Sequence, residues 1–198
     1  MKYKDFLETT KLSKEDLIAH ATGNLLSDPP DEFPQVPAPP FLMVDRVTEI
    51  TRNGNKGKLI AEMDVRVDDL FFQIHFRNDP VQPGCLGVDA VWQLLGLYCS
   101  LNGASGAGRA LGCKEVEFMG QIRPFNKLVR YEIDIRRYSN MEEQGVSLAL
   151  GTGKVFVDDS HIYTVNDAKA GLFKGLAYTD FPNRSKNSVG GIINQDSK

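Results

Sequence analysis

Residues 84–101 read GCLGVDAVWQLLGLYCSL, and this stretch decides the fold. It predicts a helix with apolar side chains on nearly every side, namely Val88, Ala90, Val91, Trp92, Leu94, Leu95, Leu97 and Tyr98. A helix that is apolar all round is buried inside a domain rather than laid on its surface. We expect the helix to begin near residues 84–86, and the glycine-rich run at 103–108 predicts its end.

Strand patterns lie on both sides of this helix. Residues 59–67 and 129–136 alternate apolar and polar side chains with a period of two, which is typical of a half-buried strand. Residues 146–150, 154–157 and 161–165 are also strand-like, and the DDS sequence at 158–160 is a plausible hairpin turn. One buried helix among antiparallel strands predicts an α+β fold, in which a curved sheet wraps around the helix.

The first forty residues predict a short helix and an extended arm. Ser13 is the expected N-cap, Glu15 and Asp16 place negative charge in the first turn, and Gly23 ends the helix. Leu17, Ile18 and Ala21 would form its apolar side. Residues 28–40 (DPPDEFPQVPAPP) contain too many prolines for a helix or a central strand, so we expect an arm laid over the domain.

Composition limits the class of protein. The chain has 198 residues, of which 41% are hydrophobic, and a net charge of −3. We therefore expect a single domain over residues 1–177 with a polar, peripheral tail over 178–198, and no basic field that would attract nucleic acid. The N-terminal segment does not have the pattern of a signal peptide, and the apolar run near residues 88–101 is too short and polar to favour membrane insertion.

Cysteines and histidines give no metal-binding pattern. Cys85, Cys99 and Cys113 form no CxxC pair, which argues against a disulfide framework or a zinc cluster and favours a reducing, cytoplasmic location. His20 and His161 lie far apart in the sequence without ligand spacing. We expect neither a metal nor another cofactor.

His75 and Asp89 are the candidate proton-transfer residues. Ile74 and Phe76 surround His75 with apolar side chains, in what reads as the end of a strand, and this setting favours a neutral base. Asp89 interrupts an apolar helix, where desolvation favours the protonated form that a general acid needs, and Gln93, one turn later, could hold its carboxyl group. The alternatives are a structural histidine with one hydrogen bond, and a solvated or ion-paired acid favoured by the helix dipole.

Gly84 is the candidate oxyanion site. A glycine lets a substrate carbonyl approach the backbone closely, and the first amides of a helix favour negative charge. The alternative is an ordinary turn from loop to helix. Together, the three residues fit the dehydration of a 3-hydroxyacyl thioester, in which His75 removes the C2 proton, Asp89 protonates the leaving hydroxyl and Gly84 binds the enolate oxygen.

Five motifs resemble the family of bacterial 3-hydroxydecanoyl-acyl-carrier-protein dehydratase/isomerases. They are PAP..LM.DRV (37–47), HF..DPV.PGCLG.DA.WQL.G (75–96), GRALG (108–112), EV.F.GQ (115–121) and IYT..D.K.GLF (162–173). The resemblance covers roughly residues 12–175. It implies a hot-dog fold and a homodimer with active sites at the subunit interface, where His75 of one chain faces Asp89 of the other.

The resemblance also assigns supporting roles. It implies that the amide of Gly84, with that of Cys85, binds the substrate carbonyl and that the carbonyl of Val81 orients the histidine. It implies that Gln93 supports the acid, while Arg109, within GRALG, is either structural or lines the site. The chain departs from the family pattern at Ile74, Arg77 and Gln82, and in its long tail.

The acid indicates the reaction. Related dehydratases that do not isomerise use glutamate at the position of Asp89, so aspartate favours the bifunctional branch. The expected activity is dehydration of a (3R)-3-hydroxyacyl chain of about C10 on acyl-carrier protein to the trans-2-enoyl product, then isomerisation to cis-3, in unsaturated fatty acid synthesis. The alternatives are a dehydratase without isomerase activity, a hydratase, a thioesterase on the same fold, or a non-catalytic interaction subunit.

The implied partner, acyl-carrier protein, is acidic, so basic residues near the tunnel mouth would guide it. The candidates are Arg77, Arg123, Lys127, Arg136, Arg137 and Lys174, each of which also reads as an ordinary solvated charge.

Overall fold

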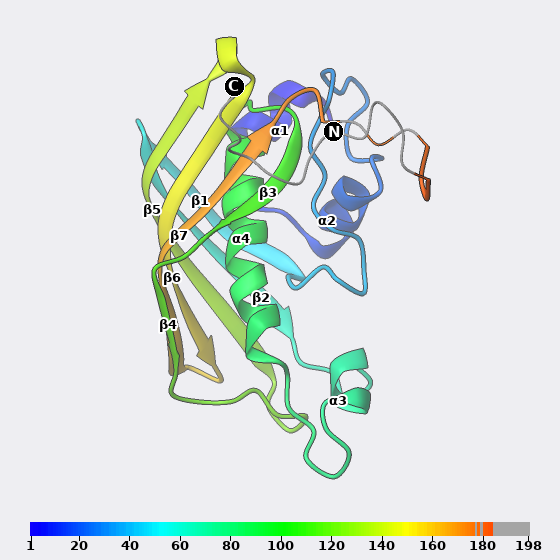
Figure 1. Ribbon diagram of the computed structural model, residues 1–198, viewed down its shortest axis with the longest axis vertical. Helices are drawn as coiled ribbons and strands as arrows, with labels where there is room; N and C mark the ends of the chain where they lie inside the picture. Colours follow the sequence, from blue (N-terminus) through cyan, green and yellow to red (C-terminus); the bar gives the residue numbers. More distant parts are fainter. Residues whose placement is uncertain (177, 179, 184–198) are drawn as a thin grey trace.

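In the computed structural model, which describes residues 1–176, 178 and 180–183, seven strands form one antiparallel sheet that curves around a central helix (Figure 1). Their order is β1-β2-β5-β6-β7-β3, and β4 also pairs with β7. The bounds are β1 Arg46–Asn53, β2 Lys56–Asp64, β3 Ala107–Gly112, β4 Glu115–Phe118, β5 Leu128–Met141, β6 Val146–Val157 and β7 Ser160–Phe173. The predicted α+β hot-dog architecture is confirmed.

The central helix α4 (Gly84–Leu101) has the predicted bounds and lies along the concave face of the sheet (Figure 1). Most of its side chains are buried, and it packs mainly against β7, β6 and β5. A Cβ at Gly153 on β6 would lie 2.7 Å from Cγ2 of Val91, so the helix approaches the sheet backbone closely there. Among the described residues, α4 alone has the length and composition to cross a membrane, and 67% of it is buried.

The predicted strand at 129–136 is confirmed as part of β5, which continues to Met141, and the other predicted strands also differ in length. Val129, Tyr131, Ile133 and Ile135 all point from β5 into the core. The runs at 146–150 and 154–157 are one strand, β6, and the turn at 158–159 leads directly into β7. β2 ends at Asp64, so Val67, which we expected on the buried face, is 75% exposed.

The N-terminal segments cover the side of α4 that faces away from the sheet (Figure 1). Helix α2 (Lys14–Ala21) begins with the predicted Ser13 cap, in which Asp16 completes a capping box. Leu17 and Ala21 are buried, but Ile18 is 37% exposed. The short helix α1 (Tyr3–Glu8) was not expected from the sequence, and it buries Phe6 against His20 and Phe33.

The proline-rich arm contains no helix or strand, as expected. It is buried in part, through Pro34 and Val36. The amide of Tyr3 donates to Asp28, and the N-terminal ammonium group donates to the carbonyl of Leu25, which ties this region to the first helix. Most of the predicted tail (178–198) lies outside the described residues, and the division at 177 stays a prediction.

Candidate active site

His75 directly follows a short helix, α3 (Leu70–Ile74), and does not end a strand as expected. The apolar run that resembled a strand instead forms a single helical turn, which buries Phe71 and Phe72 in the core. The amide of His75 closes this turn on the carbonyl of Phe71. The chain then loops back, so that the amide of Val81 donates to the carbonyl of His75 at 2.8 Å.

The imidazole of His75 has a defined orientation. Its Nδ1 lies 2.9 Å from the carbonyl oxygen of Val81. Because a carbonyl only accepts, Nδ1 carries the proton in this hydrogen bond, and Nε2 of the neutral ring has a free lone pair. The ring is half-buried and lies beside Phe76. The site therefore contains a histidine that is held ready to accept a proton.

Asp89 lies on α4, one turn after its first residues, and Gln93 holds its carboxylate. Nε2 of Gln93 donates to Oδ2 of Asp89 at 2.6 Å and to the carbonyl of Phe41 at 2.9 Å. Oε1 of Gln93 accepts from the amide of Met43 at 3.1 Å. The end of the arm thus fixes the glutamine, and the glutamine fixes one oxygen of the acid, while the other oxygen has no hydrogen-bond partner among the described residues.

Gly84 is the first residue of α4, with Pro83 as its N-cap. No described side chain caps this end of the helix, and the first amides of a helix have no partner within it. A Cβ at Gly84 would lie 2.6 Å from the ring of Phe118, a half-exposed residue of β4. Only glycine therefore fits here without moving Phe118, and the amides of Gly84 and Cys85 can interact with a negatively charged oxygen.

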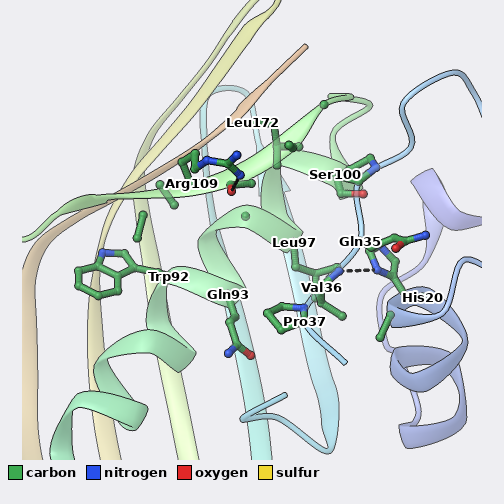
Figure 2. A pocket seen from close by; sticks show the side chains of 18 of the residues that line it. His20, Gln35, Val36, Pro37, Trp92, Gln93, Leu97, Ser100, Arg109 and Leu172 are labelled. Carbon is green, nitrogen blue, oxygen red and sulfur yellow. Dashed lines mark hydrogen bonds between the residues drawn. The ribbon is translucent and has the colours of Figure 1, made fainter. Parts of the chain in front are cut away.

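A cavity of about 710 Å³ opens beside Asp89. Its floor is a stripe of α4, its walls come from the arm and from β3, and Arg109 lies on the β3 side (Figure 2). The guanidinium of Arg109 donates to the carbonyl of Gly108. Asp89, Gln93 and Arg109 thus share one cavity, which is large enough for an acyl chain.

The structure does not bring His75 and Asp89 together within one chain. His75 is not among the described residues that line the cavity, and no hydrogen bond joins the two side chains in the part of the chain that the structure describes. The structure thus shows the candidate acid at the cavity and the candidate base outside its lining. Their predicted roles, and those of Val81, Gly84, Cys85, Gln93 and Arg109, stay proposals.

A family model described as a FabA-like domain matches residues 36–166, which is more than half of the chain. The chain belongs to the FabA-like domain family. All the candidate site residues named above fall within the match, whereas α1, α2 and most of the arm precede it. Membership supports a role as a hydro-lyase of the dehydratase type.

Two solved structures were found to be similar to the FabA-like chain. The dehydratase heterocomplex ApeI:P from Xenorhabdus doucetiae is 12% identical, with a TM-score of 0.51; the match covers 82% of this chain and 91% of that chain. The PaaI protein of E. coli, from a phenylacetic acid degradation operon, is 10% identical with a TM-score of 0.43; that match covers 59% of this chain and 72% of that chain.

Most of the predicted carrier-binding charges are exposed, and two of them are already paired. Arg123 forms an ion pair with Asp79, and Arg136 forms one with Asp167. Contact with a carrier protein would have to compete with these pairs, so their role stays a prediction. Among the described residues, no group of three potential metal-binding side chains occurs.

Sequence reasoning missed two groups of buried polar side chains in this FabA-like domain. His20 and Ser100 line the far part of the cavity, and Gln82, Tyr131 and Tyr163 are buried near the start of α4. Burial raises the pKa of the Tyr131 hydroxyl well above its usual range, and that of Tyr163 rises for the same reason. For Ser100 a signal was present, because it follows Asp89 by eleven residues and so lies on the same helix face.

Proposed function

We propose that this FabA-like protein dehydrates a (3R)-3-hydroxyacyl chain of about C10 on acyl-carrier protein to the trans-2-enoyl product, and then isomerises it to the cis-3-enoyl product. The observation that carries the proposal is the Asp89 carboxylate, which Gln93 holds at the cavity with one oxygen available. The orientation of His75, with Nε2 free to accept a proton, adds the base that this reaction needs.

Each of these residues has one role in the dehydration. Nε2 of His75 takes the C2 proton, and the electrons of the broken bond form an enolate whose oxygen is stabilised by the amides of Gly84 and Cys85. The enolate then forms the C2–C3 double bond as the C3–O bond breaks. The leaving hydroxyl takes the proton of Asp89 and departs as water. For isomerisation, the Asp89 carboxylate accepts a proton from C4, the double bond moves from C2–C3 to C3–C4, and the protonated His75 returns its proton to C2, which restores both residues.

We further propose that the working enzyme is a homodimer, because His75 does not line the cavity of the chain in which Asp89 lies. Strand β3 ends the strand order, and its described backbone pairs on one side only, with β7. Leu111, Phe118 and Met119 expose apolar surface along and after β3 and β4. An exposed edge with apolar neighbours suits pairing with a second copy, which would bring His75 of each chain to Asp89 of the other.

The test is product analysis with purified protein and 3-hydroxydecanoyl thioester. We expect a trans-2-enoyl and then a cis-3-enoyl product, identified by gas chromatography of the methyl esters. His75→Ala and Asp89→Asn should each lower the rate of dehydration about 10²–10⁴-fold, since each removes one proton-transfer group. His161→Ala is the matched control, because His161 is exposed and lies outside the cavity. Full activity in both site variants would overturn the assignment.

The same assay separates the alternative activities. Release of free thiol without an alkene would indicate a thioesterase, and a trans-2 product alone would indicate a dehydratase without isomerase activity. Asp89→Glu introduces the residue that the non-isomerising relatives use. We expect it to retain dehydration and to lower the share of the cis-3 product.

A further inference from the structure

The cavity beside Asp89 continues along α4 to a polar end. Its floor is formed by Asp89, Trp92, Gln93, Gly96, Leu97 and Ser100. These positions follow the spacing i, i+3, i+4, i+7, i+8 and i+11, which places them on one face of the helix. Asp89 and Ser100 are therefore separated by three turns, or about 16 Å along the helix axis.

The middle of the cavity is apolar and open. Leu97, Val36 and Leu172 lie between the end at Trp92 and the end at His20 (Figure 2). A Cβ at Gly96 would meet no atom within 4 Å, so the missing side chain leaves space above the helix. An extended acyl chain advances roughly 1.3 Å per bond, so a C10 chain with C3 at Asp89 would end near Gly96. The cavity reaches further than that.

Two buried polar atoms at the far end have no partner among the residues that the structure describes. They are Nε2 of His20 and Oγ of Ser100, and each residue is only 1% exposed. Both side chains line the cavity, His20 from α2 and Ser100 from α4 (Figure 2). Leaving such groups unpaired costs free energy, which a ligand oxygen could offset.

The hydrogen bonds of His20 define what its free nitrogen offers. The amide of Val36 donates to Nδ1 at 3.2 Å, so the neutral ring carries its proton on Nε2. Burial lowers the pKa of His20 to about 4, and the ring is therefore neutral at physiological pH. A neutral donor and a serine hydroxyl at the same cavity suit a ketone or hydroxyl oxygen. It does not suit a carboxylate, whose buried charge would need a cation.

We infer that the cavity selects acyl chains that carry a keto or hydroxyl oxygen about twelve bonds beyond C3, which His20 and Ser100 bind by hydrogen bonds. This inference rests on the proposed function for the position of C3 at Asp89. It extends that function to long, distally oxygenated 3-hydroxyacyl thioesters. Both polar residues project from helices, His20 from α2 and Ser100 from α4, and a ligand oxygen would reach them once their side chains turn toward the cavity.

The test compares two ligands that cannot be turned over, the pantetheine amides of 15-oxohexadecanoic and hexadecanoic acid, by calorimetry on the full chain. We expect the oxo ligand to bind about tenfold more tightly, as two hydrogen bonds to otherwise unpaired groups would give. The double variant His20→Asn/Ser100→Ala should reduce this ratio to about twofold or less. Asparagine keeps an acceptor for the Val36 amide while removing the Nε2 donor.

Two further variants keep the test decisive. If His20→Asn does not fold, as judged by its thermal unfolding, Ser100→Ala alone should reduce the ratio to about threefold. Gly96→Leu should weaken both C16 ligands relative to the decanoyl amide, because its side chain fills the middle of the cavity. Equal binding of the oxo and plain ligands by the unmodified protein would overturn the inference, and so would a preference that survives the double variant.

The experiments distinguish a failure of the proposed function from a failure of the polar binding site. A preference for the oxo ligand without any dehydration of 3-hydroxydecanoyl thioester would leave the polar site in place and refute the dehydratase. Dehydration of 3-hydroxydecanoyl thioester without a preference for the oxo ligand would support the dehydratase and refute the polar site.

Discussion

At the scale of single residues, two buried glutamines have opposite surroundings, Gln82 just before α4 and Gln93 in the middle of it. Both amide atoms of Gln93 are hydrogen-bonded, to Asp89, Phe41 and Met43. Gln82 is 5% exposed and lies near the hydroxyl of Tyr131, but neither amide atom makes a hydrogen bond with good geometry to a described residue. A buried polar group with partners stabilises a fold, whereas one without them costs free energy.

Replacing each glutamine by methionine, which has a similar volume, should therefore have opposite effects. We expect Gln82→Met to raise the free energy of unfolding by about 1 kcal/mol, because a buried unpaired amide is removed. Gln93→Met should lower it by about 2–3 kcal/mol, because it leaves three groups unpaired. Urea denaturation of both variants measures this difference. A loss of stability in Gln82→Met would show that its amide has a partner after all.

His20 makes stability depend on pH. Its pKa falls from 6.5 to about 4 on burial, so the unfolded chain binds more protons between these values. The contribution of the neutral ring to the free energy of unfolding is complete above pH 6.5. It is lost as the pH falls toward 4, and the loss amounts to up to about 3 kcal/mol. Urea denaturation at pH 7.5 and pH 4.5 measures the change in the free energy of unfolding between the two pH values. We expect this change to be smaller for His20→Asn than for the unmodified protein. Equal differences would contradict a buried neutral His20.

The candidate site could be predicted from the sequence only in part. Asp89 and Gln93 lie one helical turn apart, so their contact follows from helix geometry alone. The hydrogen bond between His75 and Val81 depends on a loop whose course no periodicity describes. His20 belongs to a different helix, which reaches the cavity only because the arm folds back over α4. The unpaired state of its Nε2 therefore could not be read from residue spacing.

At the scale of elements, α4 and β7 meet where Gly87 contacts Tyr163. A Cβ at Gly87 would lie 1.6 Å from the hydroxyl oxygen of Tyr163. That hydroxyl is buried, and among the described residues it has no partner. The glycine therefore allows the helix to lie against the tyrosine, and the hydroxyl group itself contributes little to stability.

Gly87→Ala should accordingly destabilise the protein by about 1–3 kcal/mol through overpacking. Tyr163→Phe alone should be nearly neutral, because it removes an unpaired oxygen. The double variant should recover part of the loss, since the closest contact has gone, although the ring carbon remains at 2.9 Å. A double-mutant cycle by urea denaturation measures the coupling. Strictly additive effects would show that the two residues do not determine this contact.

Elements with a long, regular pattern of apolar residues could be predicted from the sequence. Elements that are short, or whose pattern is interrupted, could not. α4 and the first part of β5 were predicted correctly because burial on one or all sides imposes a pattern on many residues, whereas β5 continues to Met141 beyond that pattern. Helix α3 has five residues, and β3 is mostly exposed, so neither has enough buried positions to show a period. β6 appeared as two runs because Gly151 and Gly153 interrupt its apolar pattern. Gly153 is required there by the close approach of Val91.

At the scale of the whole molecule, the proposed dimer makes a quantitative prediction. If His75 of one chain acts with Asp89 of the other, a heterodimer of His75→Ala and Asp89→Asn chains contains one intact site and one doubly altered site. Random reassociation of a 1:1 mixture should then restore about a quarter of the unmodified activity, although each variant alone is nearly inactive. Activity is measured after mild denaturation and joint refolding. No recovery, with dimers present, would place both residues of a site in one chain.

The cavity also has a consequence for how this protein can change. Its floor, on α4, carries the proposed acid, while one wall comes from residues 32–38 of the arm, most of which precede the FabA-like match. The wall is a separate stretch of the chain and contains no helix or strand. Insertions or exchanges in the arm could therefore reshape which chains fit while the reaction chemistry stays intact, so that substrate range and catalytic rate could evolve, or be engineered, largely independently.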